Sequence, residues 1–257
     1  MSLVEPTVDI REDTDQYSLA VDRATAWLMT NRNFGNTFIG AAGGWEANQS
    51  RALRLLSTFS TAGQLLLLRS DLKIPVTDVT DVTESGQTYG ESVISANPDH
   101  ILQMIPADCG VASISGFSDV TGGLVKGLVH IGRHPVGRAT HLKAFDHMSE
   151  RYGLSPEDLD VRVAPSARKE SYCFEDIDTA QKFDPRWKGY LAKEDDGMWH
   201  VDVHGRAVDD LLAIGVNPAR LTVSPVDTMA SPDYYSNYHQ QRGRQESGYN
   251  AVFIANS

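Results

Sequence analysis

The feature that most constrains the fold is a series of three short apolar segments that follow one another between residues 101 and 131. Apolar segments of this length, bounded by turn residues, are typical of buried β-strands. Because a strand that pairs with its successor travels out and back, the outer ends of such a hairpin lie side by side. Three strands are therefore predicted here, at Ile101 to Ile105, Val111 to Ile114 and Leu124 to Ile131.

Cys109 and His130 stand at matching ends of this predicted hairpin, so we expect the thiol and the imidazole to lie close together. A thiolate serves as a metal ligand or as a nucleophile, and in either use a nearby imidazole shares the metal or holds the proton. The other interpretation is that Cys109 is a buried structural cysteine. Cys173 is the only other cysteine, and both are predicted to be free thiols because the sequence carries no secretion signal.

Helical and strand-like patterns alternate along the rest of the chain. The apolar positions after Asn48 recur at helical spacing towards Gly63, and a second helix is predicted from Val136 to Tyr152, with Gly153 as its stop. Further helices are predicted over residues 176–183 and 202–214, and further strands over residues 65–68, 91–95, 160–164, 221–224 and 249–255. This mixture predicts an α+β fold with mixed central β-sheets flanked by helices. The run from Tyr17 to Thr30 mixes helix formers with strand formers and favours neither.

With 257 residues the chain can bury one sizeable core, so a single domain over residues 1–257 is predicted, with an acidic N-terminal extension over residues 1–16. The formal net charge of −11 argues against a broad nucleic-acid-binding face, which needs clustered Lys and Arg. No apolar run is long enough to span a membrane. We therefore expect a cytoplasmic protein whose partner is a small molecule, while the sequence leaves the oligomeric state open.

Loops offer candidate substrate contacts. Arg32 lies in a turn-rich stretch, followed by a second loop signal at Gly40 to Gly44, and can meet an anion there, although a solvated surface cation is the simpler interpretation. Tyr172 ends a polar loop that follows a strand, a common position for substrate contacts. The aromatic cluster around Tyr235 suits stacking against a ring, or else packs beside the core. The helix predicted to begin near Val136 would aim backbone N–H groups at an anion close to His130.

Several stretches together resemble the polyphenol oxidase or laccase-domain family, bacterial proteins also described as purine nucleoside phosphorylases. The family pattern reads roughly D-A-L-V-T, then T-A-D-C, then V-H-A-G-W-R-G, and the resemblance continues in order to the end of the chain. It implies the fold that laccase-domain proteins share with bacterial toxin deamidases. The matching stretches are Gly90 to Ser95, Leu102 to Cys109, Gly127 to Gly132, Ala164 to Tyr172 and Tyr234 to Arg244.

In that family one Cys and two His bind a metal, usually taken as zinc, beside a pocket for nucleoside and phosphate. The resemblance implies that Cys109 and His130 are two of these ligands, with zinc favoured over copper. Where the family has its first His, this chain has no His, and Asp71 is the closest candidate for the third ligand. The implied catalytic residues are Cys109, His130 and Asp108; Arg32 or Arg69 is expected to meet phosphate, and Tyr172 and Tyr235 are expected to contact the base.

Three functions remain open from the sequence. The first is a zinc-dependent purine nucleoside phosphorylase or deaminase acting on adenosine, inosine or methylthioadenosine. The second is a Cys/His-dependent hydrolase or amidase, in which His130 deprotonates Cys109, as the toxin-deamidase resemblance implies. The third is a non-catalytic binding protein that keeps the fold, since other family motif positions also differ here, such as Asp227 where the family has Cys.

Overall fold

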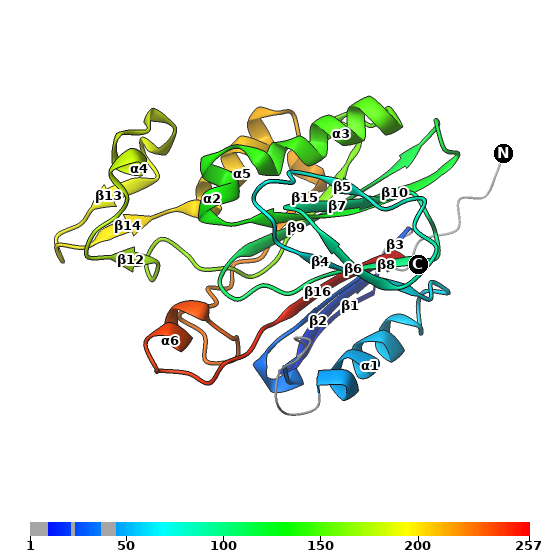
Figure 1. Ribbon diagram of the computed structural model, residues 1–257, viewed down its shortest axis with the longest axis horizontal. Coiled ribbons are helices and arrows are strands. Elements are labelled where there is room, and N and C mark those ends of the chain that lie inside the picture. The colour runs from blue at the N-terminus through cyan, green and yellow to red at the C-terminus, as the bar shows by residue number, and fades with distance from the viewer. Residues whose placement is uncertain (1–9, 22–23, 37–44) are drawn as a thin grey trace.

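The computed structural model describes residues 10–21, 24–36 and 45–257, and these residues are arranged in four layers (Figure 1). A seven-stranded sheet and a six-stranded sheet pack face to face. Helices cover the outer face of each sheet, and a small three-stranded sheet projects at one end. The predicted α+β class, with mixed sheets flanked by helices, is confirmed.

The seven-stranded sheet contains, in spatial order, β1 (Ile10–Asp13), β2 (Tyr17–Val21), β3 (Thr25–Thr30), β16 (Ala251–Asn256), β8 (His100–Met104), β4 (Gln64–Arg69) and β6 (Gly86–Tyr89). β4 runs parallel to both of its neighbours, and the other pairs are antiparallel. All six residues of β3 are buried, because the strand is covered on both faces. Its sequence therefore lacks the polar–apolar alternation that identifies a half-buried strand.

The six-stranded sheet contains, in spatial order, β15 (Leu221–Val223), β11 (Asp160–Val163), β9 (Gly110–Ser118), β10 (Gly123–Ile131), β7 (Ser92–Ser95) and β5 (Thr77–Asp78). β9 and β10 form the predicted antiparallel hairpin, in which His130 pairs with Val111 and Ile131 pairs with Gly110. β11 is parallel to β15, and β5 is parallel to β7. The hairpin thus brings the residue before β9 next to the last residues of β10.

Six α-helices and five 3-10 helices complete the described part of the chain. α1 packs on the seven-stranded sheet, whereas α2, α3 and α5 pack on the six-stranded sheet. The small sheet has the order β12-β14-β13, and α4 lies beside it (Figure 1). The bounds are α1 (Trp45–Leu56), α2 (Arg133–Gly137), α3 (Lys143–Tyr152), α4 (Thr179–Phe183), α5 (Val203–Ala213), α6 (Asn237–Gln241), β12 (Cys173–Phe174), β13 (Leu191–Lys193), β14 (Trp199–Val201), η1 (Arg32–Phe34), η2 (Thr140–Leu142), η3 (Pro156–Asp158), η4 (Pro185–Trp187) and η5 (Pro218–Arg220).

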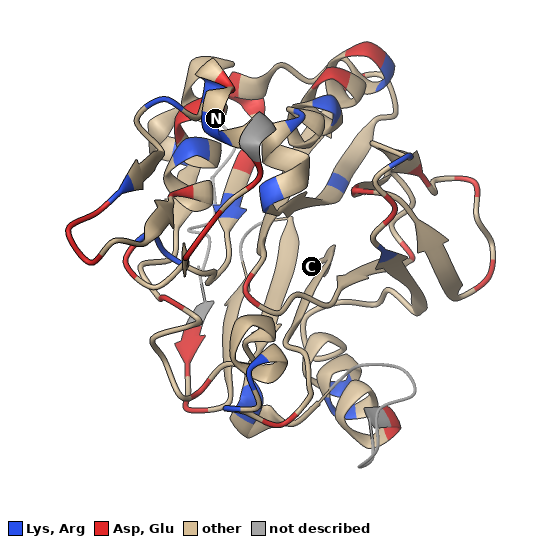
Figure 2. Cartoon of the chain, turned by 60° about the vertical axis from the view of Figure 1, so that its left-hand side comes forward, with Lys and Arg blue, Asp and Glu red and all other residues tan. Residues whose placement is uncertain are grey.

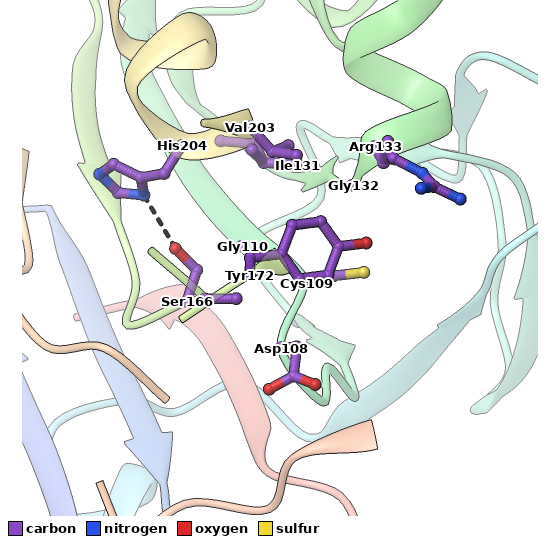
Figure 3. A pocket seen from close by; sticks show the side chains of 11 residues that line it. Asp108, Cys109, Gly110, Ile131, Gly132, Arg133, Ser166, Tyr172, Val203 and His204 are labelled. Atoms are coloured by element: carbon purple, nitrogen blue, oxygen red, sulfur yellow. Dashed lines mark hydrogen bonds between the residues drawn. The ribbon is translucent and has the colours of Figure 1, made fainter. Parts of the chain in front are cut away.

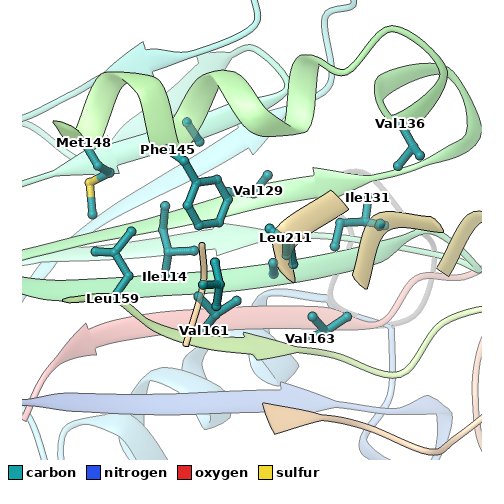
Figure 4. Close-up of a cluster of buried hydrophobic side chains, with 14 of the residues drawn as sticks. Ile114, Val129, Ile131, Val136, Phe145, Met148, Leu159, Val161, Val163 and Leu211 are labelled. Carbon is teal, nitrogen blue, oxygen red and sulfur yellow. The ribbon is translucent and has the colours of Figure 1, made fainter. Parts of the chain in front are cut away.

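Neighbouring residues of the central strands enter different cores. In β10, Leu128 packs between the two sheets, while Val129 packs under the helices. Figure 4 shows the helix-side core, where Val129 and Ile131 of β10 face Phe145 of α3 and Leu211 of α5. Because successive side chains of a strand point to opposite faces, two apolar neighbours secure both interfaces of the sheet. The hairpin that carries the candidate site is therefore held from both sides.

The helix predicted from Val136 to Tyr152 is wrong in its first part. The structure has three separate helices there, α2, η2 and α3, and the break lies at Ala139, whose φ of 57° is left-handed. A helix does begin near His130, because α2 starts at Arg133, but it has only five residues, and the expected binding of an anion at its start stays a prediction. The helix predicted after Asn48 is displaced towards the N-terminus: α1 begins at Trp45 and ends at Leu56, seven residues before Gly63.

The N-terminal region joins the sheet earlier than expected. Residues 10–13 of the predicted acidic extension form the edge strand β1, and the ambiguous run from Tyr17 to Thr30 forms β2 and β3. Residues 1–9 of that extension and the predicted loop at Gly40 to Gly44 lie outside the described residues. The division into a single domain stays a prediction.

Charged residues of both signs are interspersed along the helices and loops (Figure 2). In the described ranges, none of the helices combines the length and the apolar character needed to cross a bilayer.

Candidate functional site

The turn before β9 sets the position of Cys109. Asp108 adopts φ 74°, a left-handed conformation that Asp tolerates better than most residues, and this directs the chain from Pro106 into the strand. The Asp108 carbonyl accepts a hydrogen bond from the Ala167 N–H at 2.8 Å, which ties the turn to the loop after β11. Cys109 then stands immediately before β9, beside the end of β10 that carries His130.

Cys109, His130 and Glu91 form a hydrogen-bonded chain. The imidazole of His130 is hydrogen-bonded to the Cys109 thiol on one side, and its Nδ1 donates a hydrogen bond to Glu91 Oε2 at 2.6 Å on the other. Glu91 is fully buried, and its second oxygen accepts from Ser70 Oγ at 2.6 Å. Gly132 fits closely against the pair, because a Cβ there would lie 2.8 Å from His130 Nε2 and 3.3 Å from Cys109 Sγ.

The charges of this chain favour a protonated imidazole. Burial alone lowers the pKa of His130, but the negative charge and hydrogen bond of Cys109, together with those of Glu91, outweigh it and raise this pKa to about 10. Burial raises the pKa of Glu91, and its hydrogen bonds to His130 and Ser70 reverse the effect, so that this pKa is lowered overall. A thiol beside an imidazolium that a buried carboxylate holds in place is the arrangement that activates cysteine nucleophiles.

Two cavities meet at Cys109. The larger has a volume of about 360 Å³, and Cys109, His130, Arg69, Asn237 and Tyr249 are among the residues that line it. The smaller, about 30 Å³, lies on the side of Gly132, Tyr172 and Ser166 (Figure 3). A volume of 360 Å³ is within the range of small-molecule sites, so the larger cavity is the candidate substrate pocket.

The donor set does not fit the expected zinc or copper site. No group of three or more His, Cys, Asp or Glu side chains among the described residues is arranged to hold a metal ion. Cys109 and His130 are hydrogen-bonded to each other, while Glu91 lies on the opposite edge of the imidazole ring. These residues therefore offer two converging protein ligands, whereas a catalytic zinc needs three and a blue-copper site needs two His besides Cys.

Two predicted acidic residues have other tasks. Asp71, the expected third ligand, is absent from the lining of both cavities, and its Oδ1 accepts from the Lys73 N–H at 2.9 Å. Asp108, predicted to be catalytic, directs its buried carboxylate away from Cys109 (Figure 3). There it accepts hydrogen bonds from Ser236 Oγ at 2.9 Å, the Tyr238 N–H at 2.8 Å and Thr228 Oγ1 at 3.2 Å. Asp108 thus fixes a distant loop against the turn.

Of the four predicted substrate contacts, two line a cavity beside Cys109 and two do not. Arg69 lines the larger cavity and Tyr172 the smaller one. Arg32 pairs through its guanidinium with Glu246 at 3.3 Å and lines neither cavity, so its role as a substrate contact stays a prediction. Tyr235 is buried against Gly248, where a Cβ would lie only 2.2 Å from its ring, and it also lines neither cavity, so its contact with a base stays a prediction.

Sequence reasoning missed Glu91, Ser70 and Arg133. Glu91 precedes a short strand whose two central residues are Val93 and Ile94, and a carboxylate at the head of a buried strand is the signal that was available. Ser70, one residue before Asp71 in the chain, supplies the hydroxyl that donates a hydrogen bond to Glu91. Arg133 lines the smaller cavity and places its guanidinium 5.1 Å from the centre of the Phe174 ring.

Comparison with known proteins places these features in a family. The family model for "Multi-copper polyphenol oxidoreductase laccase" matches residues 47–256. The fold is similar to that of a Bacillus licheniformis hypothetical protein, YfiH, with 15% identity, a TM-score of 0.77 and coverage of 95% of this chain and 98% of that chain. YlmD from Geobacillus stearothermophilus gives 16% identity, a TM-score of 0.76 and coverage of 98% and 99%. A Neisseria meningitidis protein, NMB0706, gives 12% identity, a TM-score of 0.71 and coverage of 97% of this chain and 99% of that chain. Among curated proteins, none matches the chain.

Proposed function

The chain belongs to the multi-copper polyphenol oxidoreductase laccase family, and from that premise we propose that it is an enzyme of purine nucleoside chemistry whose reacting groups are Cys109, His130 and Glu91. The observation that carries the proposal is the hydrogen-bonded chain of thiol, imidazole and buried carboxylate on the wall of a cavity of about 360 Å³. The substrate class rests on the resemblance to proteins also described as purine nucleoside phosphorylases.

The reaction that suits this chain of groups is hydrolytic deamination of a 6-aminopurine nucleoside. The Cys109 thiolate attacks C6, the S–C6 bond forms, and His130 gives its proton to the amino group, which leaves as ammonia. Water then adds to C6, its proton passes to His130, the C6–S bond breaks, and the thiolate is restored. Glu91 keeps the imidazole oriented through both steps, in the role that the third member of a catalytic triad has.

Phosphorolysis is a second candidate, and Arg69 is the observation that favours it. Arg69 lines the cavity that Cys109 and His130 line, where a cationic side chain can bind phosphate. In that reaction His130, as an acid, would protonate the departing purine base. The two candidates differ in their second substrate, water or phosphate.

The test is incubation of the purified protein with adenosine, inosine and methylthioadenosine, each with and without phosphate, followed by separation of the products and an ammonia assay. Deamination predicts inosine and ammonia from adenosine without phosphate, and no product with Cys109→Ala. Cys173→Ala is the matched control and retains the activity. Phosphate-dependent release of free base would favour the second candidate. If all three nucleosides remain unchanged while simple amides or esters are hydrolysed in a Cys109-dependent manner, the amidase interpretation replaces both.

A further inference from the structure

A third cavity, which we call the edge cavity, has a volume of about 560 Å³ and lies between the two large sheets, near their edge strands β1 and β15. Its walls come from β2 and β3 of the seven-stranded sheet, from β11 and β15 of the six-stranded sheet, and from the loops that follow these strands. None of the described residues lines both the edge cavity and a cavity at Cys109. Its volume is within the range of roughly 300–1,000 Å³ that ligand sites have, so it is a candidate for a second binding site.

Carboxylates gather at one end of the edge cavity, where Asp13, Asp15 and Asp233 all line it. The Asn33 side chain holds two of these residues together, because its Nδ2 donates to the Asp15 carbonyl at 2.9 Å and to Asp233 Oδ1 at 3.1 Å. Asp13 and Asp233 both act on the phenol of Tyr234, whose pKa is raised by burial and by these two charges. Among the described side chains, none with a positive charge forms an ion pair with the three carboxylates. Because a wall of like charges attracts the opposite charge, this end favours a protonated amine.

The opposite end of the edge cavity offers a hydrogen-bond donor and a cation. Trp27 of β3 pairs with Ala20 of β2, and its side chain packs between the two sheets, where it lines the cavity. The side chain is 6% exposed, and its indole Nε1–H is buried without an acceptor among the described residues. Arg162 of β11 places its guanidinium 5.3 Å from the centre of the Trp27 ring. Since a buried donor without a partner is costly, this end favours a ligand that brings an anionic acceptor.

The length of β3 sets the distance between the two ends. Asn31 follows Trp27 by four residues, and its Nδ2 donates to the Asp15 carbonyl at 2.9 Å. Because a strand advances about 3.3 Å per residue, the acidic end and the Trp27 end lie roughly 13 Å apart. An extended peptide spans about 3.3–3.6 Å per residue, so three or four residues bridge this distance. Apolar residues such as Val163 and Val226 complete the walls.

The edge strand β15 gives the cavity a surface that recognises a peptide backbone. Thr222 and Val223 of β15 line the cavity, and among the described strands β15 pairs with β11 alone. The outer edge of such a strand presents backbone N–H and C=O groups, which a bound peptide can pair with as an added strand. A polyamine would satisfy the carboxylates, but it has no acceptor for Trp27 Nε1 and no backbone to pair with β15. A peptide with free termini satisfies all three features.

We propose that the edge cavity binds a short extended peptide of three or four residues. Its protonated N-terminus lies among Asp13, Asp15 and Asp233, and its C-terminal carboxylate lies at Trp27 and Arg162. A peptide amino group has a pKa of about 7.7–8.0, so it carries the required positive charge at pH 7. This site is separate from the chemistry proposed at Cys109 and does not depend on it.

The test is isothermal titration calorimetry of the full chain at pH 7 with trialanine, N-acetyl-trialanine and spermidine as probes. Asp15→Asn removes one charge of the acidic end and keeps the size of the side chain. Trp27→Phe removes the indole N–H and keeps an aromatic ring. Asp119→Asn is the matched control, because Asp119 is an exposed carboxylate in the loop between β9 and β10 that does not line the cavity. Cys109→Ala shows whether binding is independent of the catalytic proposal.

We expect one trialanine per chain with a Kd below about 1 mM, and binding weakened about 10- to 100-fold by N-acetylation, since this removes a charge-assisted contact. Asp15→Asn should weaken the binding of trialanine but not that of its N-acetyl form, and Trp27→Phe should weaken both. Asp119→Asn and Cys109→Ala should bind as the parent does. The proposal is overturned if trialanine does not bind, if neither N-acetylation nor Asp15→Asn changes its affinity, or if spermidine binds more tightly than trialanine in an Asp15-dependent manner. The Asp15 variants decide the matter even if Trp27→Phe does not fold.

Discussion

Replacing Glu91 by Gln tests whether the buried carboxylate activates the thiol. The substitution keeps the size of the side chain but removes the charge that accepts a 2.6 Å hydrogen bond from His130 Nδ1. Hydrogen bonds to a charged partner contribute about 1.5–3 kcal/mol, and each 1.4 kcal/mol is about a factor of ten in an equilibrium. The substitution destabilises the His130 imidazolium by that amount, and it is this imidazolium that stabilises the thiolate of Cys109. We therefore expect Glu91→Gln to lower the alkylation rate of Cys109 at pH 7 about 10- to 100-fold.

The assay is the rate of modification by iodoacetamide, followed by intact mass spectrometry in a Cys173→Ser background so that only Cys109 reacts. Asp71→Asn is the matched control, because Asp71 is a carboxylate whose charge acts on Glu91 but which does not bond to His130. Its loss should change the rate less than about threefold, as expected for a charge that is not fully buried. A Glu91→Gln variant that reacts as fast as the parent would refute the assignment of Glu91, provided that its circular dichroism spectrum shows a folded protein.

Three further predictions concern other residues of the fold. Burial lowers the pKa of Lys126 from 10.5 to about 7. Between these two pH values the unfolded chain binds more protons than the folded chain, so the free energy of unfolding rises with pH, by up to roughly 5 kcal/mol at 1.4 kcal/mol per pH unit. Urea unfolding of Lys126→Met should show a smaller rise of this free energy with pH, and an unchanged rise contradicts the argument. Asp108→Ala should lower the free energy of unfolding by about 3 kcal/mol in the same urea measurement, because the hydrogen-bond donors of Thr228, Ser236 and Tyr238 lose their buried acceptor. A loss below about 1 kcal/mol would show that the loop that carries these donors does not depend on Asp108. Arg32→Ala should leave turnover unchanged and cost less than about 1 kcal/mol of stability, since it breaks only an exposed ion pair with Glu246; a large loss of turnover would restore Arg32 as a substrate contact.

The proximity of Cys109 and His130 was accessible from the sequence because it follows from the geometry of a hairpin. Two consecutive apolar strands with a polar loop between them form a hairpin that brings their outer ends together, and in the structure His130 pairs with Val111. Glu91 was not accessible in the same way. Its burial depends on contacts with Ser70 and His130, which are 21 and 39 residues away, and no local pattern encodes these contacts.

The side chain that reaches the site after β4 was not accessible from the sequence for a related reason. Position in a motif suggested Asp71, but the side chain that reaches the site after β4 is Ser70, and a shift of one residue at the end of a strand changes the face on which a side chain lies. The predicted helix from Val136 to Tyr152 failed because Ala139 is left-handed, a conformation that alanine rarely adopts and its sequence does not announce. The roles of Arg32 and Tyr235 could not be decided from the sequence, because polar and aromatic loop residues form surface ion pairs and pack in loop cores as readily as they bind ligands.

The most direct test of the account is the labelling of Cys109 by iodoacetamide before and after treatment with a chelator, together with the zinc content of the protein purified without added metal. If Cys109 and His130 act as nucleophile and base, labelling is fast, independent of the chelator and slowed by Glu91→Gln, and zinc is well below one atom per chain. About one zinc per chain, lost in Cys109→Ala, with labelling only after chelation, would contradict this account and return the pair to the role of metal ligands.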